Sequence, residues 1–298
     1  MCDVLVALGP ATASGTTLFA KNSDRPPAER QVLEFVPSRL DDRSTRVTHV
    51  TVDASTVATH ACVVSRPVWG WGAEHGVNVH GLAVGNTTVY TTLDPRGAAP
   101  GPTGMDLVRL ALERAATVDE AVEVITSSLV RYGQGGSGHD PAAGRDRPYW
   151  NSFMVADPWS AAVIDTSGTE FAVERVDAVR AISNRTTIPS FDAVHRHPRQ
   201  PVERLVDPRW RASEAVLARR PVSVESLMAH LRSHDSCGDQ GWSVCMHVEG
   251  VESTTSSMVA ELAVGGGSTL WVMTGNPCAG EYRRVAFAEA AGADLSTV

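Results

Sequence analysis

The second residue of the chain, Cys2, is the strongest candidate for a catalytic group. Small residues after an initiator methionine favour its removal, and loss of Met1 would leave Cys2 with a free α-amine. The ordinary pKa is about 7.7–8.0 for an α-amine and about 8.5 for a thiol, so one residue would supply a nucleophile and a matched base. An isolated Met-Cys start is usually incidental, so the prediction depends on the residues that accompany it.

Two charged residues on the following strand are candidates to act with Cys2. Residues 3–8 and 16–22 are strand-like runs separated by a Gly-containing turn, which predicts a β-hairpin that begins at Cys2. Lys21 is the single lysine of a chain whose other basic residues are all arginine, which favours a specific need for an ammonium there. Asp24 follows three residues later. Without Cys2 at this spacing, Lys21 would be an ordinary charge at a strand edge, and Asp24 would be a residue that caps the turn of the strand.

The segment from Cys2 to Pro26 resembles the start of N-terminal-nucleophile (Ntn) hydrolases that carry cysteine after the initiator. The shared pattern is cysteine, an apolar strand, a turn, and then Phe19-Ala20-Lys21-Asn22-Ser23-Asp24-Arg25-Pro26. Its ending is similar to the dipeptidase and secernin branch, and the segment is more distantly similar to bile salt hydrolases and penicillin V acylases. Further likenesses, around residues 81–86, 181–184 and 243–258, extend it to about residue 275.

This resemblance implies a role for each matching residue. Cys2 is the nucleophile and the base, and Asp24 accepts a hydrogen bond from its α-amine. Lys21 lowers the pKa of the thiol electrostatically. Asn86 and Asn184 donate hydrogen bonds to the developing oxyanion or orient the substrate, although asparagine is also common in turns.

The resemblance also implies an active-site arginine at the start of a helix after the second asparagine. Arg209 and Arg211 both fit, because the intervening loop aligns poorly, and we favour Arg211. It implies no metal and no organic cofactor.

Two other motifs are weaker signals. Gly133 to Gly138 matches a dinucleotide-binding glycine pattern, but it follows a helix and opens none, so we interpret it as a loop. His234, Cys237, Cys245 and His247 are donor types found in zinc sites. Their spacing departs from the common zinc-knuckle pattern, so we predict core residues and no bound metal.

The pattern of elements predicts an α+β fold. Two helices over residues 103–115 and 117–130, the second opened by a capping pattern, should pack side by side on a sheet. Strand-like runs surround them, one of them over residues 47–52, and residues 152 to 176 form a meander. Two more helices are expected at 209–219 and 224–232. The resemblance implies a single domain over residues 1–298, a four-layer αββα sandwich with two antiparallel sheets between helix layers.

Composition limits the partners. A net charge of −8 argues against nucleic acid, and no apolar run approaches the length of a membrane span. Five scattered cysteines do not make a disulfide framework, so we expect a reduced, cytoplasmic protein. The sequence does not decide whether the protein forms a homo-oligomer.

The sequence therefore predicts a cysteine-dependent hydrolase of the C–N amide bond in a small substrate, a dipeptide or an N-acyl amino compound. Acyl transfer through the same acyl-enzyme and a non-catalytic secernin-like scaffold are the alternatives. We expect the pocket walls to come from residues 66–71, 133–148 and 185–208.

Overall fold

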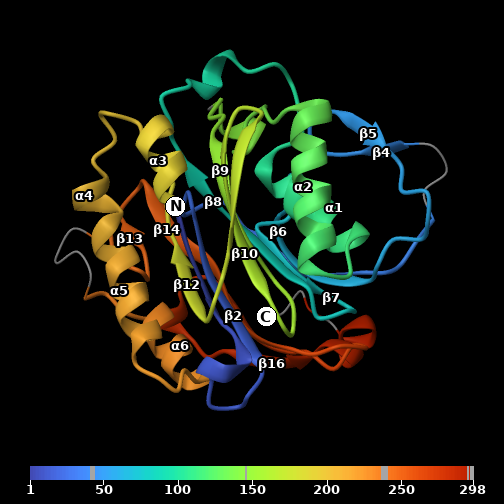
Figure 1. Cartoon of the computed structure of the whole chain (residues 1–298), viewed down its shortest axis with the longest axis vertical. Coiled ribbons are helices and arrows are strands. Elements are labelled where there is room, and N and C mark those ends of the chain that lie inside the picture. The colour runs from blue at the N-terminus through green and yellow to red at the C-terminus, as the bar shows by residue number, and fades with distance from the viewer. Residues whose placement is uncertain (41–43, 145, 236–240, 294, 296–298) are drawn as a thin grey trace.

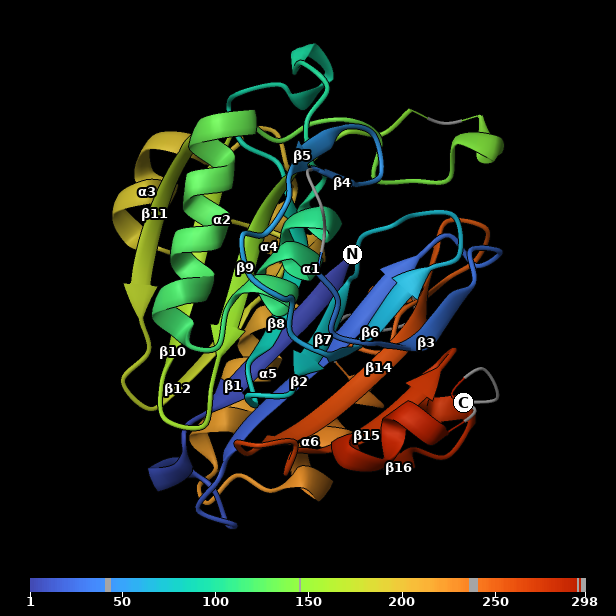
Figure 2. The ribbon, with the colours of Figure 1, turned by 90° about the vertical axis from the view of Figure 1, so that its right-hand side faces the viewer.

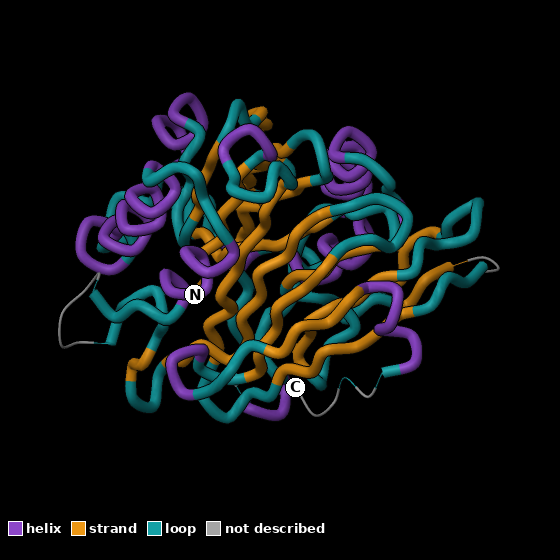
Figure 3. The backbone as a smooth tube through the Cα atoms, turned by 90° about the horizontal axis from the view of Figure 1, so that it is seen from below, coloured by secondary structure: helices purple, strands orange, loops and turns teal. Residues whose placement is uncertain are grey.

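Two antiparallel sheets lie face to face in the computed structural model, which describes residues 1–40, 44–144, 146–235, 241–293 and 295. Helices α1 and α2 cover one outer face and α3 to α6 the other (Figures 1 and 3). This confirms the predicted α+β sandwich of four layers. The helices are α1 (Gly104–Arg114), α2 (Val118–Tyr132), α3 (Pro189–His195), α4 (Val202–Leu205), α5 (Asp207–Ala218) and α6 (Val224–Leu231).

The first sheet has the strand order β12-β1-β2-β14-β15-β16, with β13 also paired to β14, and the second has β11-β10-β9-β8-β7-β6-β3. A two-stranded sheet, β4–β5, is separate. The strands are β1 (Cys2–Ala7), β2 (Thr17–Arg25), β3 (Gln31–Val36), β4 (Ser44–Arg46), β5 (Thr51–Asp53), β6 (Cys62–Pro67), β7 (His75–Asn78), β8 (Ala83–Val89), β9 (Trp150–Ala156), β10 (Ala161–Ser167), β11 (Glu170–Arg175), β12 (Val179–Ile182), β13 (His247–Val248), β14 (Glu252–Leu262), β15 (Thr269–Thr274) and β16 (Arg283–Ala286).

Side-chain alternation along β1 shows how the layers pack. Val4 and Val6 belong to the core between the two sheets, whereas Leu5 and Ala7 pack with residues of α5 and α6. Successive side chains of a strand point to opposite faces, so neighbouring positions of β1 face the second sheet and the helices in turn. By the same rule, Cys2 faces the second sheet and Asp3 faces the helices.

Helices α1 and α2 pack side by side on the second sheet, as predicted, and Figure 2 shows them over β8, β9 and β10. Thr103 and Asp106 form a capping box at the start of α1, and the Thr117 side chain accepts a hydrogen bond from Glu120 N at the start of α2. These caps satisfy backbone N–H groups that have no partner inside the helix.

One predicted strand is wrong, and another lies in a different sheet than its neighbours. Residues 47–52 were expected to form a single strand, but the chain turns within them, between β4 and β5, where Val47 N donates to Val50 O. The meander of β9, β10 and β11 does not continue into β12, which crosses to the first sheet and pairs with β1.

Helices α3 and α4 and strand β16 were not predicted. Among the described residues, none of the helices combines the length and the hydropathy that a membrane crossing requires.

Candidate active site

Cys2 is the first residue of β1, and its side chain is 3% exposed. It pairs with Ser23 of β2, and directly paired residues of antiparallel strands point to the same face. That face looks towards the second sheet, where the Cys2 Sγ lies 3.9 Å from the Glu74 Oε2. The thiol is therefore enclosed between the two sheets.

Lys21 lies beside the thiol on the same inter-sheet face and is fully buried. Its Nζ donates to Ser23 Oγ at 2.7 Å and lies 3.4 Å from Glu74 Oε2. Burial raises the pKa of the Cys2 thiol above its ordinary value, and the positive charge of Lys21 opposes that rise. The thiol therefore needs a base to become a nucleophile near neutral pH.

Glu74 was not predicted, and it balances the positive charges around the thiol. Its Oε1 accepts from Arg25 Nη1 at 2.9 Å. Although burial acts in the opposite direction, Lys21 and Arg25 hold the pKa of Glu74 below its ordinary value, so it is ionised. In the sequence, Glu74 is marked only by its place between Gly72 and Gly76, and such a pattern is not specific.

Asp24 lies on the opposite face of β2 from Lys21, because three residues along a strand reverse the direction of the side chain. Thr254 Oγ1 donates to Asp24 Oδ1 at 2.7 Å, whereas the buried Oδ2 has no hydrogen-bond partner among the described residues. Burial raises the pKa of Asp24 to about 7, against the opposing charges of the Met1 ammonium and Arg209. A buried carboxylate oxygen that accepts no hydrogen bond is unfavourable, so an additional donor near Asp24 Oδ2 would be stabilising.

Asn184 and Arg209 complete this side of the site. The Cys2 backbone N–H donates to Asn184 Oδ1 at 3.0 Å, and Arg209 Nη2 donates to the same oxygen at 2.8 Å. Arg209 Nη1 donates to Asp3 Oδ2 at 2.7 Å, with both side chains fully buried. Asn184 thus contacts the nitrogen that removal of Met1 would turn into an amine.

Arg209, and not Arg211, is the arginine that the structure brings to Cys2. The Arg211 side chain is 74% exposed, and its nearest ion-pair partner is Asp207 at 3.9 Å. Both arginines lie in α5, and positions two apart on a helix point about 200° away from each other. The sequence left this choice open because the loop between Asn184 and this helix aligns poorly with the family.

Asn86 lies beside Glu74, the residue whose carboxylate is next to the Cys2 thiol. In β8 its amide contacts Asn151 Oδ1 at 2.9 Å, and the reversed amide orientation would donate to Glu74 Oε2 at 3.2 Å. Its expected role as an oxyanion donor stays a prediction.

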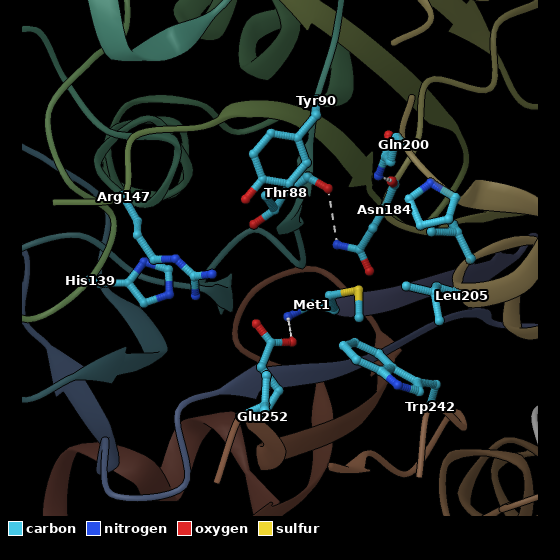
Figure 4. A pocket seen from close by; sticks show the side chains of 13 residues that line it. Met1, Thr88, Tyr90, His139, Arg147, Asn184, Gln200, Leu205, Trp242 and Glu252 are labelled. Carbon is cyan, nitrogen blue, oxygen red and sulfur yellow. Dashed lines mark hydrogen bonds and ion pairs between the residues drawn. The ribbon is translucent and has the colours of Figure 1, made fainter. Parts of the chain in front are cut away.

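Met1, the residue bonded to the nitrogen of Cys2, lines a pocket (Figure 4). Its α-ammonium forms an ion pair with Glu252 Oε2 at 2.6 Å and donates to the backbone oxygen of Asp24 at 2.9 Å. The pocket around it is a cavity of about 220 Å³. Its lining includes Thr88, Tyr90, His139, Arg147, Asn184, Gln200, Leu205, Trp242 and Glu252.

The predicted pocket walls are partly confirmed. Residues 133–148 contribute His139 and Arg147, and residues 185–208 contribute Gln200 and Leu205, but residues 66–71 do not line this cavity. The aromatic side chains of the lining include Tyr90 and Trp242 (Figure 4).

The fold is similar to that of two proteins of known structure. A penicillin V acylase from Agrobacterium tumefaciens has a TM-score of 0.54 at 15% identity, over 92% of this chain and 83% of that one. A mutant conjugated bile acid hydrolase from Clostridium perfringens has a TM-score of 0.55 at 13% identity, over 96% of each chain. The chain has the Ntn-hydrolase fold.

A sequence match adds to this likeness. Residues 11–137 match the family model of acyl-coenzyme A:6-aminopenicillanic acid acyl-transferase. In the Ntn-hydrolase fold of this chain, the position of Cys2 at the buried start of a central strand agrees with the sequence-based expectation. The likeness to the dipeptidase and secernin branch stays a prediction.

Proposed function

We propose that this chain is an amide hydrolase that acts through an acyl-thioester on Cys2, after removal of Met1. The observation that carries the proposal is that both the thiol and the backbone nitrogen of Cys2 have a polar partner suited to catalysis. The Cys2 thiol lies beside Lys21, and its backbone nitrogen lies beside Asn184. Asp24, on the neighbouring strand β2, has a buried carboxylate oxygen that accepts no hydrogen bond from the described residues.

The α-amine of Cys2 would act as the base. The surrounding protein favours the neutral thiol, so attack on an amide carbonyl requires a proton acceptor within reach. An amine on the same residue takes the thiol proton, and the resulting ammonium gives it to the leaving nitrogen. Asp24 Oδ2 accepts a hydrogen bond from this amine, while Asn184 orients it. Water then attacks the thioester, releases the acid and restores the thiol.

The way Met1 is held supports a substrate with a free amino group. Met1 is an aminoacyl group joined to the nitrogen of Cys2, and the acyl-enzyme would carry an aminoacyl group on the sulfur of the same residue. The ammonium of Met1 already has two partners, Glu252 and the carbonyl oxygen of Asp24. We therefore propose a dipeptide or another small aminoacyl amide, with its ammonium bound at Glu252.

Acyl transfer is the second candidate function, because the family model that matches residues 11–137 is that of an acyl-transferase. It would use the same acyl-enzyme, with an amine in place of water. Adding an ordinary amine acceptor, such as an amino acid, separates the two: a hydrolase yields mainly the free acid, whereas a transferase yields mainly the new amide.

The test combines intact mass and turnover. We expect the purified active protein to lack Met1, and Cys2→Ser to lower dipeptide hydrolysis at least 100-fold. Cys62→Ala, which alters a buried cysteine elsewhere in the chain, should keep activity. A short incubation with dipeptides should add one aminoacyl mass to the peptide that carries Cys2. Activity in protein that retains Met1 would exclude the free-amine mechanism, and failure of every amide to acylate Cys2 would favour the scaffold alternative.

A further inference from the structure

Two cysteines and two histidines meet on segments that the proposed reaction does not use. His234 follows α6, Cys245 precedes β13, His247 begins β13, and Cys278 lies in a short 3-10 helix (Pro277–Ala279). One ligand atom from each of the four residues lies within 4.8 Å of every other. We propose that these four side chains bind a structural Zn²⁺ ion.

The distances fit a tetrahedral metal site. His247 Nε2 lies 3.4 Å from Cys245 Sγ and 3.2 Å from Cys278 Sγ. Zinc bonds of about 2.3 Å to sulfur and 2.0–2.1 Å to nitrogen place tetrahedral ligand atoms roughly 3.3–3.8 Å from one another. Small side-chain movements therefore bring all four atoms to bonding distance of one central ion.

The arrangement around His247 favours an ion over hydrogen bonds or a disulfide. A single ring nitrogen faces both sulfur atoms, and a neutral imidazole nitrogen has either one proton to donate or one lone pair to accept, so it forms one good hydrogen bond and not two. A disulfide between Cys245 and Cys278 would explain why the two cysteines are close together, but not why two imidazole rings lie within 4.8 Å of the same sulfur atoms. The rings of His234 and His247 have centroids 5.0 Å apart, edge to face.

Hydrogen bonds to backbone carbonyl oxygens hold the three segments together without help from a metal. Cys245 N donates to Ser233 O at 3.0 Å, which fixes the Cys245 segment to the end of α6. Arg232 Nε donates to Pro277 O at 2.9 Å, and Asn276 Nδ2 donates to Met246 O at 3.0 Å. The ligands are therefore brought together in advance, which lowers the conformational entropy lost on binding.

The ligand set points to zinc and to a structural role. Two thiolates and two imidazoles in a tetrahedron are typical of zinc, and the two thiolates neutralise its charge. Four protein ligands leave no open position for water or substrate, which separates a structural site from a catalytic one. His234, His247 and Cys278 are exposed, so an ion has a route in.

The sequence pointed to part of this cluster but not to its fourth member. His234, Cys245 and His247 were recognised as donor types, with Cys237 as the expected companion. Cys237 lies outside the described residues. Cys278, 31 residues beyond His247, is the fourth member of the described cluster and shows no motif spacing with the others.

The site would support the Cys2 site through the residue between two of its ligands. Met246 N donates to Thr254 Oγ1 at 2.9 Å, and Thr254 Oγ1 donates to Asp24 Oδ1 at 2.7 Å. A zinc ion bound by Cys245 and His247, the two neighbours of Met246, would fix the position of these two hydrogen bonds. Metal loss should therefore loosen Asp24 without removing any group that touches the substrate.

The test uses the full chain, purified without a histidine tag. We expect elemental analysis to find one zinc per chain after gel filtration, and thermal melting to shift down by several degrees after chelation. Cobalt should replace zinc and give the visible absorption of tetrahedral cobalt with thiolate ligands. Cys278→Ala and His234→Ala change exposed residues, so both should fold and lose the metal.

Cys62→Ala and His197→Ala are the matched controls, since they remove a thiol and an imidazole away from the cluster and should keep one zinc per chain. The proposal does not depend on amide hydrolysis, because metal content is its readout. It is overturned if reduced wild-type protein takes up neither zinc nor cobalt. Equal metal content in Cys278→Ala and wild type, or a Cys245–Cys278 disulfide that gives no metal site after reduction, would also overturn it.

Discussion

The thiol and the backbone nitrogen of Cys2 meet different surroundings, because β1 presents them to different partners. The thiol faces Lys21 and Glu74 between the sheets, and the nitrogen faces Asn184. Burial favours the uncharged thiol, and Lys21 by itself does not cancel that effect. Reactivity therefore depends on an amine that can take the proton at the moment of attack.

Glu252→Gln tests how the substrate is selected. Because Glu252 forms an ion pair with an aminoacyl ammonium, the change should raise KM for a dipeptide with a free amino group by about 10- to 100-fold, the value of a hydrogen bond to a charged group. The same dipeptide with an acetylated amine should lose far less. Steady-state kinetics on both substrates measures the difference.

Glu249→Gln is the control for this prediction, because Glu249 is a nearby exposed carboxylate that does not line the pocket. Equal losses on the free and the acetylated dipeptide would show that Glu252 does not read the ammonium.

Single residues were predictable where a local pattern marks them. Cys2, Lys21, Asp24 and Asn184 were all named from the sequence, and the structure brings them together. Glu74 was not, because its importance comes from a contact with a strand about fifty residues earlier in the chain. No spacing within a strand records such a contact.

At the scale of elements, the site depends on how closely β8 approaches β2 across the two sheets. A Cβ added to Gly85 of β8 would lie 2.8 Å from Lys21 Cδ and 3.1 Å from Phe19 Cζ. Lys21 cannot move freely, because its Nζ is held by Ser23 and Glu74. Gly85 is therefore required for the position of the ammonium beside the thiol.

Gly85→Ala should lower kcat/KM at least tenfold by displacing Lys21, and should cost about 1–3 kcal/mol of stability, as overpacking does. Kinetics and chemical denaturation measure the two effects separately. Gly97→Ala, where an added Cβ meets nothing within 4 Å, should change neither. Reduced stability with full activity would mean that Lys21 keeps its place or has no part in the reaction.

The elements that were predicted share a local cause, and those that were missed do not. Hydrophobic periodicity and the Thr103 and Thr117 caps identify α1 and α2. In contrast, β12 pairs with β1 about 175 residues earlier, and a local pattern cannot say which sheet a strand joins. Residues 47–52 read as a strand because they contain β-branched side chains, yet the turn bond from Val47 N to Val50 O decides their structure.

At the scale of the whole molecule, the bond between Met1 and Cys2 lies inside the folded protein. The Met1 carbonyl oxygen accepts from Asp24 N at 2.7 Å, and the Cys2 N–H donates to Asn184 at 3.0 Å. Both sides of the bond are thus occupied by the first sheet and the loop after β12. An aminopeptidase needs this bond and the free amine in its own active site, so we infer that Met1 is removed before the chain folds.

Protein that retains Met1, produced in cells with methionine aminopeptidase inhibited, tests this order. We expect it to be folded and inactive, and added aminopeptidase to restore little activity while it stays folded. Unfolding it in denaturant, diluting it into aminopeptidase and letting it refold should raise activity at least tenfold, with loss of one methionine by intact mass. Processed wild type taken through the same cycle measures losses from refolding itself. Rapid activation of the folded form would contradict the order, because the Met1–Cys2 bond would then be accessible despite its contacts with Asp24 and Asn184.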